Sequence, residues 1–354
     1  MHNTLDLNTD QRRETVNTAQ RYAVLREAVS KGKSYRGSMV WSTVKGRDYL
    51  IRSAYTAKGE RKQTSLGLRS PETERMKLEY DSGRAAAEAR LKDITNVMQR
   101  QAAVNRALVL GRVPLIGARI IRALDEARLL GQGIRILGTY ALFAYEAAAG
   151  VHIDSGLTTT EDIDLLLDAR HGVSLSLADN LEEASLLALI QRVDRSFERS
   201  HQTFRAVNRD GYLVDLIKPM RNPPWTPEPS RVGGTDDLDA AEIEGLVWQE
   251  SAPAFEAICI DDRGQPLRLV TSDPRVWAVH KLWLSERADR QPLKRRRDAE
   301  QGKAVLALLQ EHMPHLPLKA EDLRMLPREV VERAFQTIDS LTHPDSPHSA
   351  HSPE

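Results

Sequence analysis

The chain has 354 residues, of which 41% are hydrophobic and 28% are charged, and this composition excludes a mostly disordered chain. Fifty basic residues balance fifty acidic ones, so the formal net charge of zero predicts no overall attraction to polyanions, although it is compatible with a local basic patch. Cys259 is the only cysteine, which excludes an intrachain disulfide and a cysteine-based zinc site.

The amino terminus and the cysteine content both bear on where the protein resides. Residues 1–17 lack the basic and then apolar layout of a secretory signal, and no run approaches the roughly 18 apolar residues of a membrane span. A single cysteine fits a reducing compartment. We therefore expect a cytoplasmic protein with no membrane partner.

The first third of the chain is predicted to form an arm, a small sheet and a helical connector. A sparse helical stripe predicts a short helix in an arm over residues 1–30. Residues 31–70 contain three β-rich runs with turns at residues 45–46 and 58–59, which predicts an antiparallel β-meander. A serine, a proline and early acidic residues then start a long solvent-facing helix or helix pair in a connector over residues 71–132.

Residues 133–272 alternate between strand-like and helix-like segments. The strands are IRILG, DIDLLLD and a hairpin of TFRAVN and YLVDLIK, with helices between the first three. The order strand, helix, strand, helix, strand, strand predicts a mixed sheet with helices on one face, and hence an α/β (α+β) fold. Residues 221–254 are rich in Pro, Gly, Asp and Glu and predict a long irregular loop, and AFEAICI with PLRLV predicts a second hairpin.

The carboxy-terminal part changes character again. Residues 273–338 carry helical patterns and predict a C-terminal helical subdomain. Residues 339–354 are polar and predict a disordered tail.

Two acidic residues stand two positions apart at the start of the strand DIDLLLD. Alternate residues of a strand project from one face, so Asp162 and Asp164 lie side by side while Ile163 points into the core. Neighbouring carboxylates repel each other unless a cation lies between them, and Mg²⁺ prefers oxygen ligands. The pair is a candidate metal clamp, with a solvated strand end as the alternative, and Glu161 and Asp168 are expected to be bystanders.

Two further features flank this pair. The strand IRILG leads through Gly138 and Thr139 into a helix, and a glycine, a hydroxyl and the free N–H groups of a helix start favour phosphate. An ordinary strand-to-helix turn is the alternative. Asp215 lies among apolar residues of YLVDLIK, where a lone acid is costly to bury unless it is paired or bound to metal. The alternative for Asp215 is an edge strand whose acid faces water.

Taken together, LGTYALFAY, TTTEDIDLLL and the later Asp215 resemble the signature of the nucleotidyltransferase superfamily of the DNA polymerase beta type. They are similar to its bacterial minimal branch, which includes the abortive-infection nucleotidyltransferase toxins. The resemblance covers residues 133–300 and implies a polymerase-beta-like core with a mixed sheet. The chain departs from the pattern in having Thr139 where many members have Gly or Ser, and in a longer segment before the acid pair.

The resemblance implies transfer of a nucleoside monophosphate from a nucleoside triphosphate to a hydroxyl acceptor, which is an RNA such as tRNA or a protein. It implies that Asp162, Asp164 and Asp215 hold two Mg²⁺ or Mn²⁺ ions, and that Gly138 and Thr139 seat the triphosphate. Two such ions clamp the entering and leaving oxygens of an in-line displacement. The resemblance also implies that Asp215 helps to activate the attacking hydroxyl.

A basic stretch near the carboxy terminus, HKLWLSERADRQPLKRRRD, is similar to a K-L...R...R/K-D pattern of the same branch. The resemblance implies that Lys281 contacts the triphosphate and extends this role to Arg287, Lys294 and Asp298. Positive groups there neutralise charge that grows on the leaving pyrophosphate. The alternative is a solvated basic face with internal salt bridges, and His280 is expected to be a packing residue.

The predicted meander is strongly basic. Residues 31–69 contain ten basic and two acidic residues, a local charge of +8, with aromatic residues interleaved. Basic groups and aromatics on a small sheet suit an RNA acceptor such as tRNA. The alternative is that Lys and Arg only prevent edge pairing, and that the acid-rich helix after Pro71 covers the patch.

Two other functions remain open beside a metal-dependent nucleotidyltransferase. One is a catalytically silent protein of the same fold that binds nucleic acid or regulates, and the other is the toxin of a toxin-antitoxin pair. The oligomeric state, the acceptor and the preferred nucleotide are left open by the residues.

Overall fold

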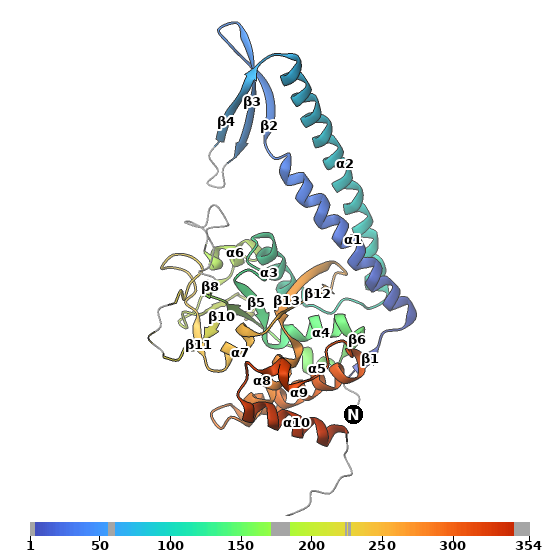
Figure 1. Cartoon of the computed structure of the whole chain (residues 1–354), viewed down its shortest axis with the longest axis vertical. Helices are drawn as coiled ribbons and strands as arrows, with labels where there is room; N and C mark the ends of the chain where they lie inside the picture. Colours follow the sequence, from blue (N-terminus) through green and yellow to red (C-terminus); the bar gives the residue numbers. More distant parts are fainter. Residues whose placement is uncertain (1–3, 56–60, 171–184, 224, 226–227, 343–354) are drawn as a thin grey trace, which may run out of the picture.

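The computed structural model describes residues 4–55, 61–170, 185–223, 225 and 228–342. Figure 1 shows a core of mixed sheet and helices, a long helical stalk that ends in a small sheet, and a layer of helices from the carboxy-terminal part. The α+β fold class is thereby confirmed. None of the helices within these described ranges is both long and apolar enough to cross a lipid bilayer.

The central sheet of the core has the strand order β5-β7-β10-β9-β8. β11 pairs with the last residues of β10, which follow the residues that pair with β9. β10 is parallel to β7 and β11 and antiparallel to β9, and β5 is antiparallel to β7, so the sheet is mixed as predicted. The bounds of its strands are β5 (Ile134–Leu137), β7 (Asp162–Leu167), β8 (Glu198–Arg199), β9 (Arg205–Val207), β10 (Leu213–Pro219) and β11 (Ala241–Ile243).

Each inner strand of this sheet has one face in the main core and one face turned the other way. In β7, Ile163, Leu165 and Leu167 belong to the main hydrophobic cluster, whereas Leu166 packs in a small separate cluster with Leu246. Strand alternation therefore places residues 162 and 164 on the face away from the main core. The same alternation applies to β10, where residues 214 and 216 are in the main cluster.

Several smaller elements complete the core. A hairpin of β12 (Ala254–Ile260) and β13 (Pro266–Ser272) packs against α4, and β1 (Thr4–Asp6) pairs antiparallel with β6 (Val151–Ile153). The helices of the core are α3 (Leu115–Glu126), η1 (Gly138–Tyr140), α4 (Ala141–Ala149), α5 (Ser155–Thr158), α6 (Leu186–Val193) and α7 (Leu246–Ser251). The carboxy-terminal helices are α8 (Pro274–Glu286), α9 (Pro292–His312), η3 (Ala320–Leu323) and α10 (Arg328–Thr342).

Two sequence-based expectations need correction. The segment 221–254 is not only irregular, because it contains β11 and α7, which are too short to give a periodic pattern. The predicted tail begins too early, since α10 continues to Thr342. Residues 343–354 lie outside the described residues.

The stalk is a pair of helices, α1 (Thr9–Ser34) and α2 (Pro71–Ala107), that pack along each other (Figure 1). Asn8 and Ser70 begin them with reciprocal capping boxes, and Pro71 opens α2. α2 is a single helix of 37 residues, which corresponds to about 55 Å at 1.5 Å per residue. The helix of the arm is longer than predicted. Of the two alternatives for the start of the connector, a single long helix is present.

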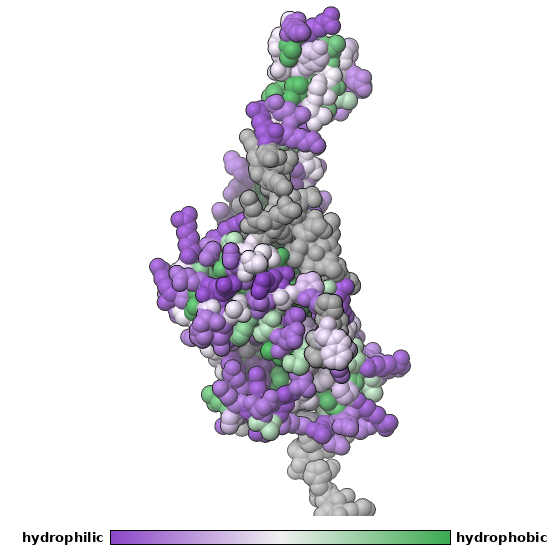
Figure 2. Space-filling model, turned by 90° about the vertical axis from the view of Figure 1, so that its left-hand side faces the viewer, coloured by the Kyte–Doolittle hydropathy of each residue, from purple (hydrophilic) through white to green (hydrophobic). Residues whose placement is uncertain are grey.

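The meander lies at the far end of the stalk, away from the core, in both views of the molecule (Figure 1 and Figure 2). It consists of β2 (Ser38–Val44), β3 (Arg47–Tyr55) and β4 (Arg61–Leu68), paired antiparallel in that order. The predicted turn at Lys45 and Gly46 is present with φ of 50° and 75°, as a two-residue hairpin turn of the I′ kind requires. The second predicted turn lies outside the described residues.

Buried polar contacts fix the base of the stalk to the β12–β13 turn. The Thr18 hydroxyl donates to Asn105 Oδ1 at 3.0 Å, and Asn105 Nδ2 donates to the carbonyl of Gly264 at 2.9 Å. A Cβ on Gly264 would lie 2.2 Å from the carbonyl oxygen of Ala102, so only glycine allows this close approach. The two stalk helices and the core are therefore locked at this point.

Candidate active site

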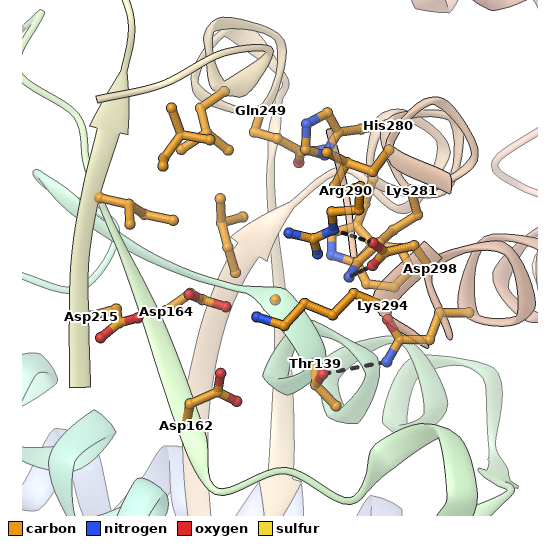
Figure 3. A pocket seen from close by; sticks show the side chains of 18 of the residues that line it. Thr139, Asp162, Asp164, Asp215, Gln249, His280, Lys281, Arg290, Lys294 and Asp298 are labelled. Carbon is orange, nitrogen blue, oxygen red and sulfur yellow. Dashed lines mark hydrogen bonds and ion pairs between the residues drawn. The ribbon is translucent and has the colours of Figure 1, made fainter. Parts of the chain in front are cut away.

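A cavity of about 340 Å³ opens between the carboxyl-bearing face of the sheet and the helices α7, α8 and α9. Figure 3 shows Asp162, Asp164 and Asp215 on one wall, with Lys281, Arg290 and Asp298 on the opposite wall. The cavity also contains an apolar section with Ile217, Ile243, Leu246 and Leu284 among its lining residues. One hollow thus joins acidic, basic and apolar surfaces.

Strand register brings the three acidic residues together. Asp162 and Asp164 share one face of β7, and the parallel pairing of β7 with β10 sets Asp215 directly beside Asp164. The alternative that Asp215 lies on an edge strand is wrong, because β10 has β7 on one side and β9 and β11 on the other. All three carboxylates line the same cavity.

Asp164 is the central carboxylate of the three. Burial and the neighbouring carboxylates of Asp162 and Asp215 raise its pKa to about 7, and Lys281 and Arg290 only partly counter this effect. The neighbouring Asp162 accepts a hydrogen bond from the hydroxyl of Thr160. Asp164 is therefore the carboxylate whose pKa burial and the crowding of negative charge raise.

Asp215 is held by an arginine that sequence reasoning did not single out. Arg205 Nε donates to Asp215 Oδ1 at 2.6 Å, and a second guanidinium nitrogen donates to Oδ2 at 2.5 Å. The two residues are directly opposite each other in the antiparallel pair β9 and β10. In this hairpin, residues equally far from Asp210 are partners, so residue 207 pairs with 213 and residue 205 with 215. The predicted hairpin therefore already contained the signal that could have placed Arg205 beside Asp215.

Gly138 and Thr139 lie at the end of β5, next to Asp164. Gly138 has a φ of +59°, and a Cβ there would lie 1.9 Å from Asp164 Oδ2, so only glycine fits beside this carboxylate. Gln301 Nε2 donates to Thr139 Oγ1 at 3.3 Å and to the carbonyl of Leu157 at 2.8 Å, which ties this turn to α9. Gln301 also lines the cavity and was not anticipated.

The opposite wall contains a buried ion network. Lys281 Nζ donates to Asp298 Oδ1 at 2.7 Å, and Arg290 Nε donates to Asp298 Oδ2 at 2.8 Å. Burial opposes ionisation of Asp298, but Lys281 and Arg290 hold its pKa below the ordinary value. Lys281 also lies 5.3 Å from the centre of the Trp277 ring. Asp298 thus fixes two cations at the edge of the cavity.

The other basic residues named from the sequence divide into two groups. Lys294 lines the cavity and extends toward the carboxylates in Figure 3, as the expectation requires. Arg287 does not line it, because its guanidinium bonds Glu244 at 2.6 Å and Asp289 at 2.8 Å. Arg290, three residues later in the loop between α8 and α9, lines the cavity in place of Arg287.

His280 is part of the aromatic packing behind the cavity. It stacks on Trp283 with ring centres 5.6 Å apart and meets the edge of Trp248 at 5.8 Å. Burial and the nearby Lys281 lower its pKa to about 3, so the imidazole is neutral at physiological pH. These contacts are those of a packing residue, as expected.

The carboxylates of the acidic wall have the right chemistry for a hard divalent cation, but their present geometry is less suited to one. Asp162 and Asp164 offer oxygen ligands, and a cation would relieve the repulsion that raises the pKa of Asp164. Within the described ranges, however, no group of three or more His, Cys, Asp or Glu side chains is arranged to hold a metal ion. The bidentate contact of Asp215 with Arg205 is the physical difference from a three-carboxylate site.

Comparison with known protein families gives a match over most of the core. A family model described as nucleotidyltransferase matches residues 116–326, which is more than half of the chain. The matched stretch runs from α3 to just beyond η3 and includes every residue that lines the cavity. Searches of curated proteins and of solved structures found no match.

The close approach of Gly138 to Asp164 predicts that a methyl group at residue 138 disturbs the cavity. Gly138→Ala should displace the Asp164 carboxylate and abolish nucleotide binding, measured by calorimetry. Gly150→Ala is the matched control, because Gly150 has a similar φ of +69° but no atom within 4 Å of its added Cβ. Both changes should lower the free energy of unfolding by about 1–2 kcal/mol, because alanine disfavours the left-handed backbone. Equal nucleotide binding by the two variants would contradict the prediction.

The raised pKa of Asp164 predicts a pH dependence of stability in metal-free buffer. Because the ordinary value is 3.8 and the folded value is about 7, the folded state holds this proton more tightly than the unfolded state. The free energy of unfolding should therefore fall as pH rises through this window, by up to about 1.4 kcal/mol per pH unit. Urea unfolding with EDTA measures this slope, and Asp164→Asn should reduce it. An unchanged slope in the variant would show that the pKa is not raised.

Proposed function

Since the chain belongs to the nucleotidyltransferase family, we propose that it transfers a nucleoside monophosphate from a nucleoside triphosphate to a hydroxyl acceptor and releases pyrophosphate. The observation that supports this most directly is the meeting of Gly138, Asp162 and Asp164 with Lys281 and Lys294 around one cavity. An acidic wall for cations faces a basic wall for phosphates. Its volume of about 340 Å³ lies within the range of small-molecule sites.

We assign the triphosphate to the space between the end of β5 and the basic wall. Gly138 and Thr139 both line the cavity at this end, where a phosphate oxygen would meet the backbone and the Thr139 hydroxyl. Lys294, and beside it the Lys281 and Arg290 pair on Asp298, would offset the negative charge that develops on the leaving pyrophosphate. The apolar section formed by β10, β11 and α7 then remains for the nucleobase.

We propose that Asp162 and Asp164 hold a divalent cation, Mg²⁺ or Mn²⁺. Such an ion supplies charge neutralisation at the phosphates and orients the reacting oxygens. Asp215 is the third carboxylate of this wall and lies where it could accept the proton of an acceptor hydroxyl, once Arg205 no longer occupies both of its oxygens. Thr160 holds Asp162 in place through its hydroxyl.

The proposal predicts transfer of label from an α-labelled nucleoside triphosphate. Incubation of the protein with each of the four nucleotides, Mg²⁺ and either cellular RNA or cellular protein should label one acceptor fraction. Asp164→Ala should lower the rate at least about a hundredfold, because loss of an ion-binding carboxylate removes several kcal/mol of transition-state stabilisation. Gel autoradiography gives the rate.

Asp210→Ala serves as the control for this assay, because Asp210 is an exposed acid in the turn between β9 and β10 and does not line the cavity. Its rate should equal that of the unaltered protein. Nucleotide binding without any transfer would contradict the proposal and favour the catalytically silent alternative. Equal transfer by Asp164→Ala would remove the assigned site.

We further propose RNA as the acceptor, on the strength of the meander. Lys31, Lys33, Arg36, Lys45, Arg47 and Lys62 are exposed around it and pair with no acidic side chain among the described residues. Arg52 and Arg69 do not contribute, because Arg52 contacts Tyr80 and Arg69 bonds Asp48 and Glu74. The acid-rich start of α2 therefore neutralises only part of the patch, and the rest suits a phosphate backbone.

The RNA proposal predicts binding that depends on the meander and on salt. Arg47→Glu with Lys62→Glu should weaken RNA binding about tenfold or more and lower the salt slope by about one unit per lost phosphate contact. Fluorescence anisotropy at several salt concentrations measures both. The control is Lys303→Glu with Arg324→Glu, an exposed basic residue of α9 and one just after η3. Equal loss in both double variants would show only an effect of net charge.

A further inference from the structure

We propose that Arg205 is the resident cation of Asp215 and competes there with a divalent ion. The free protein then binds one such ion readily at Asp162 and Asp164, and a second only when Arg205 releases Asp215. This inference rests on the proposed function, since it concerns the ions of the same site. It goes beyond it by naming a residue that sets how many ions the site holds.

The Arg205 guanidinium contacts three neighbouring side chains. It makes the two bonds to Asp215 at 2.6 and 2.5 Å, and its third nitrogen donates to Gln202 Oε1 at 2.9 Å. Its guanidinium carbon also lies 5.4 Å from the centre of the Phe204 ring. A bidentate arginine contact of this kind is stronger and more directional than a simple ion pair.

The pairing is built into the backbone. Arg205 and Asp215 are direct cross-strand partners in β9 and β10, and Asp215 is in turn the direct partner of Asp164 in β7. One line across three strands therefore carries Arg205, Asp215 and Asp164 in order. Opposite charges at directly opposed positions attract across an antiparallel pair. The strand register that brings Asp215 beside Asp164 thus also places Arg205 at the acidic wall.

The remaining carboxylates of the wall are not engaged by a cation in this way. Asp162 accepts a hydrogen bond from the neutral hydroxyl of Thr160, and within the described part of the chain Asp164 takes part in no ion pair shorter than 4.0 Å. Carboxylate oxygens that form no ion pair are open to a divalent ion. The Asp162 and Asp164 pair is therefore the first place for an ion.

A second ion at Asp215 meets a different situation. An ion on its carboxylate would stand within a few ångströms of the guanidinium, and like charges at that range repel. One of the two must leave. The Arg205 side chain is 28% exposed and lines the cavity, so it has room to turn from Asp215 toward the open side.

Binding of Mn²⁺ in the absence of nucleotide tests this inference, with electron paramagnetic resonance counting free and bound ions. The unaltered protein should bind one ion with high affinity and a second at least tenfold more weakly. Arg205→Gln should tighten the second ion about tenfold, the scale set by loss of one charged hydrogen-bonded partner. Arg205→Lys, which keeps the charge but not the two-pronged contact, should tighten it less.

Arg209→Gln is the matched control, because Arg209 is an exposed arginine four residues later in the same hairpin and lies outside the cavity. Its titration should equal that of the unaltered protein. A second ion of unchanged affinity in both Arg205 variants would overturn the inference, as would two equally tight ions in the unaltered protein. Mn²⁺ should also raise the melting temperature of Arg205→Lys more than that of the unaltered protein, which keeps the test valid if Arg205→Gln does not fold.

Failure of the proposed function gives a different result. If the unaltered protein binds no Mn²⁺, or if Asp164→Asn binds it equally well, the ion site itself is wrong. If Mn²⁺ binds at the Asp164 site but Arg205→Gln and Arg205→Lys change nothing, only the competition at Asp215 is wrong.

Discussion

The parallel pairing of β7 with β10 determines the chemistry of the cavity, because it sets the carboxylate of Asp164 beside that of Asp215. With Asp162 two residues away on the same strand face, three acids share a wall, and burial together with their repulsion raises the pKa of Asp164. Basic side chains offset part of this negative charge. Arg205 forms a bidentate contact with Asp215, and Lys294 extends toward the carboxylates (Figure 3).

The antiparallel pairing of β5 with β7 explains why the turn after β5 has a glycine at its first position. Leu137 is the cross-strand partner of Asp164, and the next residue, Gly138, turns back over the Asp164 carboxylate. The main-chain turn and the acidic residue therefore occupy one small volume. A phosphate placed there would lie against backbone and beside any cation on the acidic wall, which is the juxtaposition that nucleotidyl transfer needs.

Much of this arrangement follows from local rules that the amino-acid pattern obeys. The alternation of side chains along a strand places Asp162 and Asp164 on one face. The hairpin across Asp210 makes β9 a neighbour of β10. Residues whose place depends on tertiary packing were harder to predict. Arg287 and Arg290 are both basic and three positions apart, and only the course of the loop between α8 and α9 turns one to Glu244 and the other to Asp298. β11 was missed because a three-residue strand forms only where β10 offers it an edge.

The joint at the base of the stalk has a consequence for any partner that touches both ends of the molecule. The contacts among Thr18, Asn105 and Gly264 connect α1, α2 and the β12–β13 turn of the core. The meander is therefore carried on a rod of about 55 Å rather than on a tether. Under the proposed function, such a rod would set the distance between the place where an acceptor is bound at the meander and the end that reacts in the cavity.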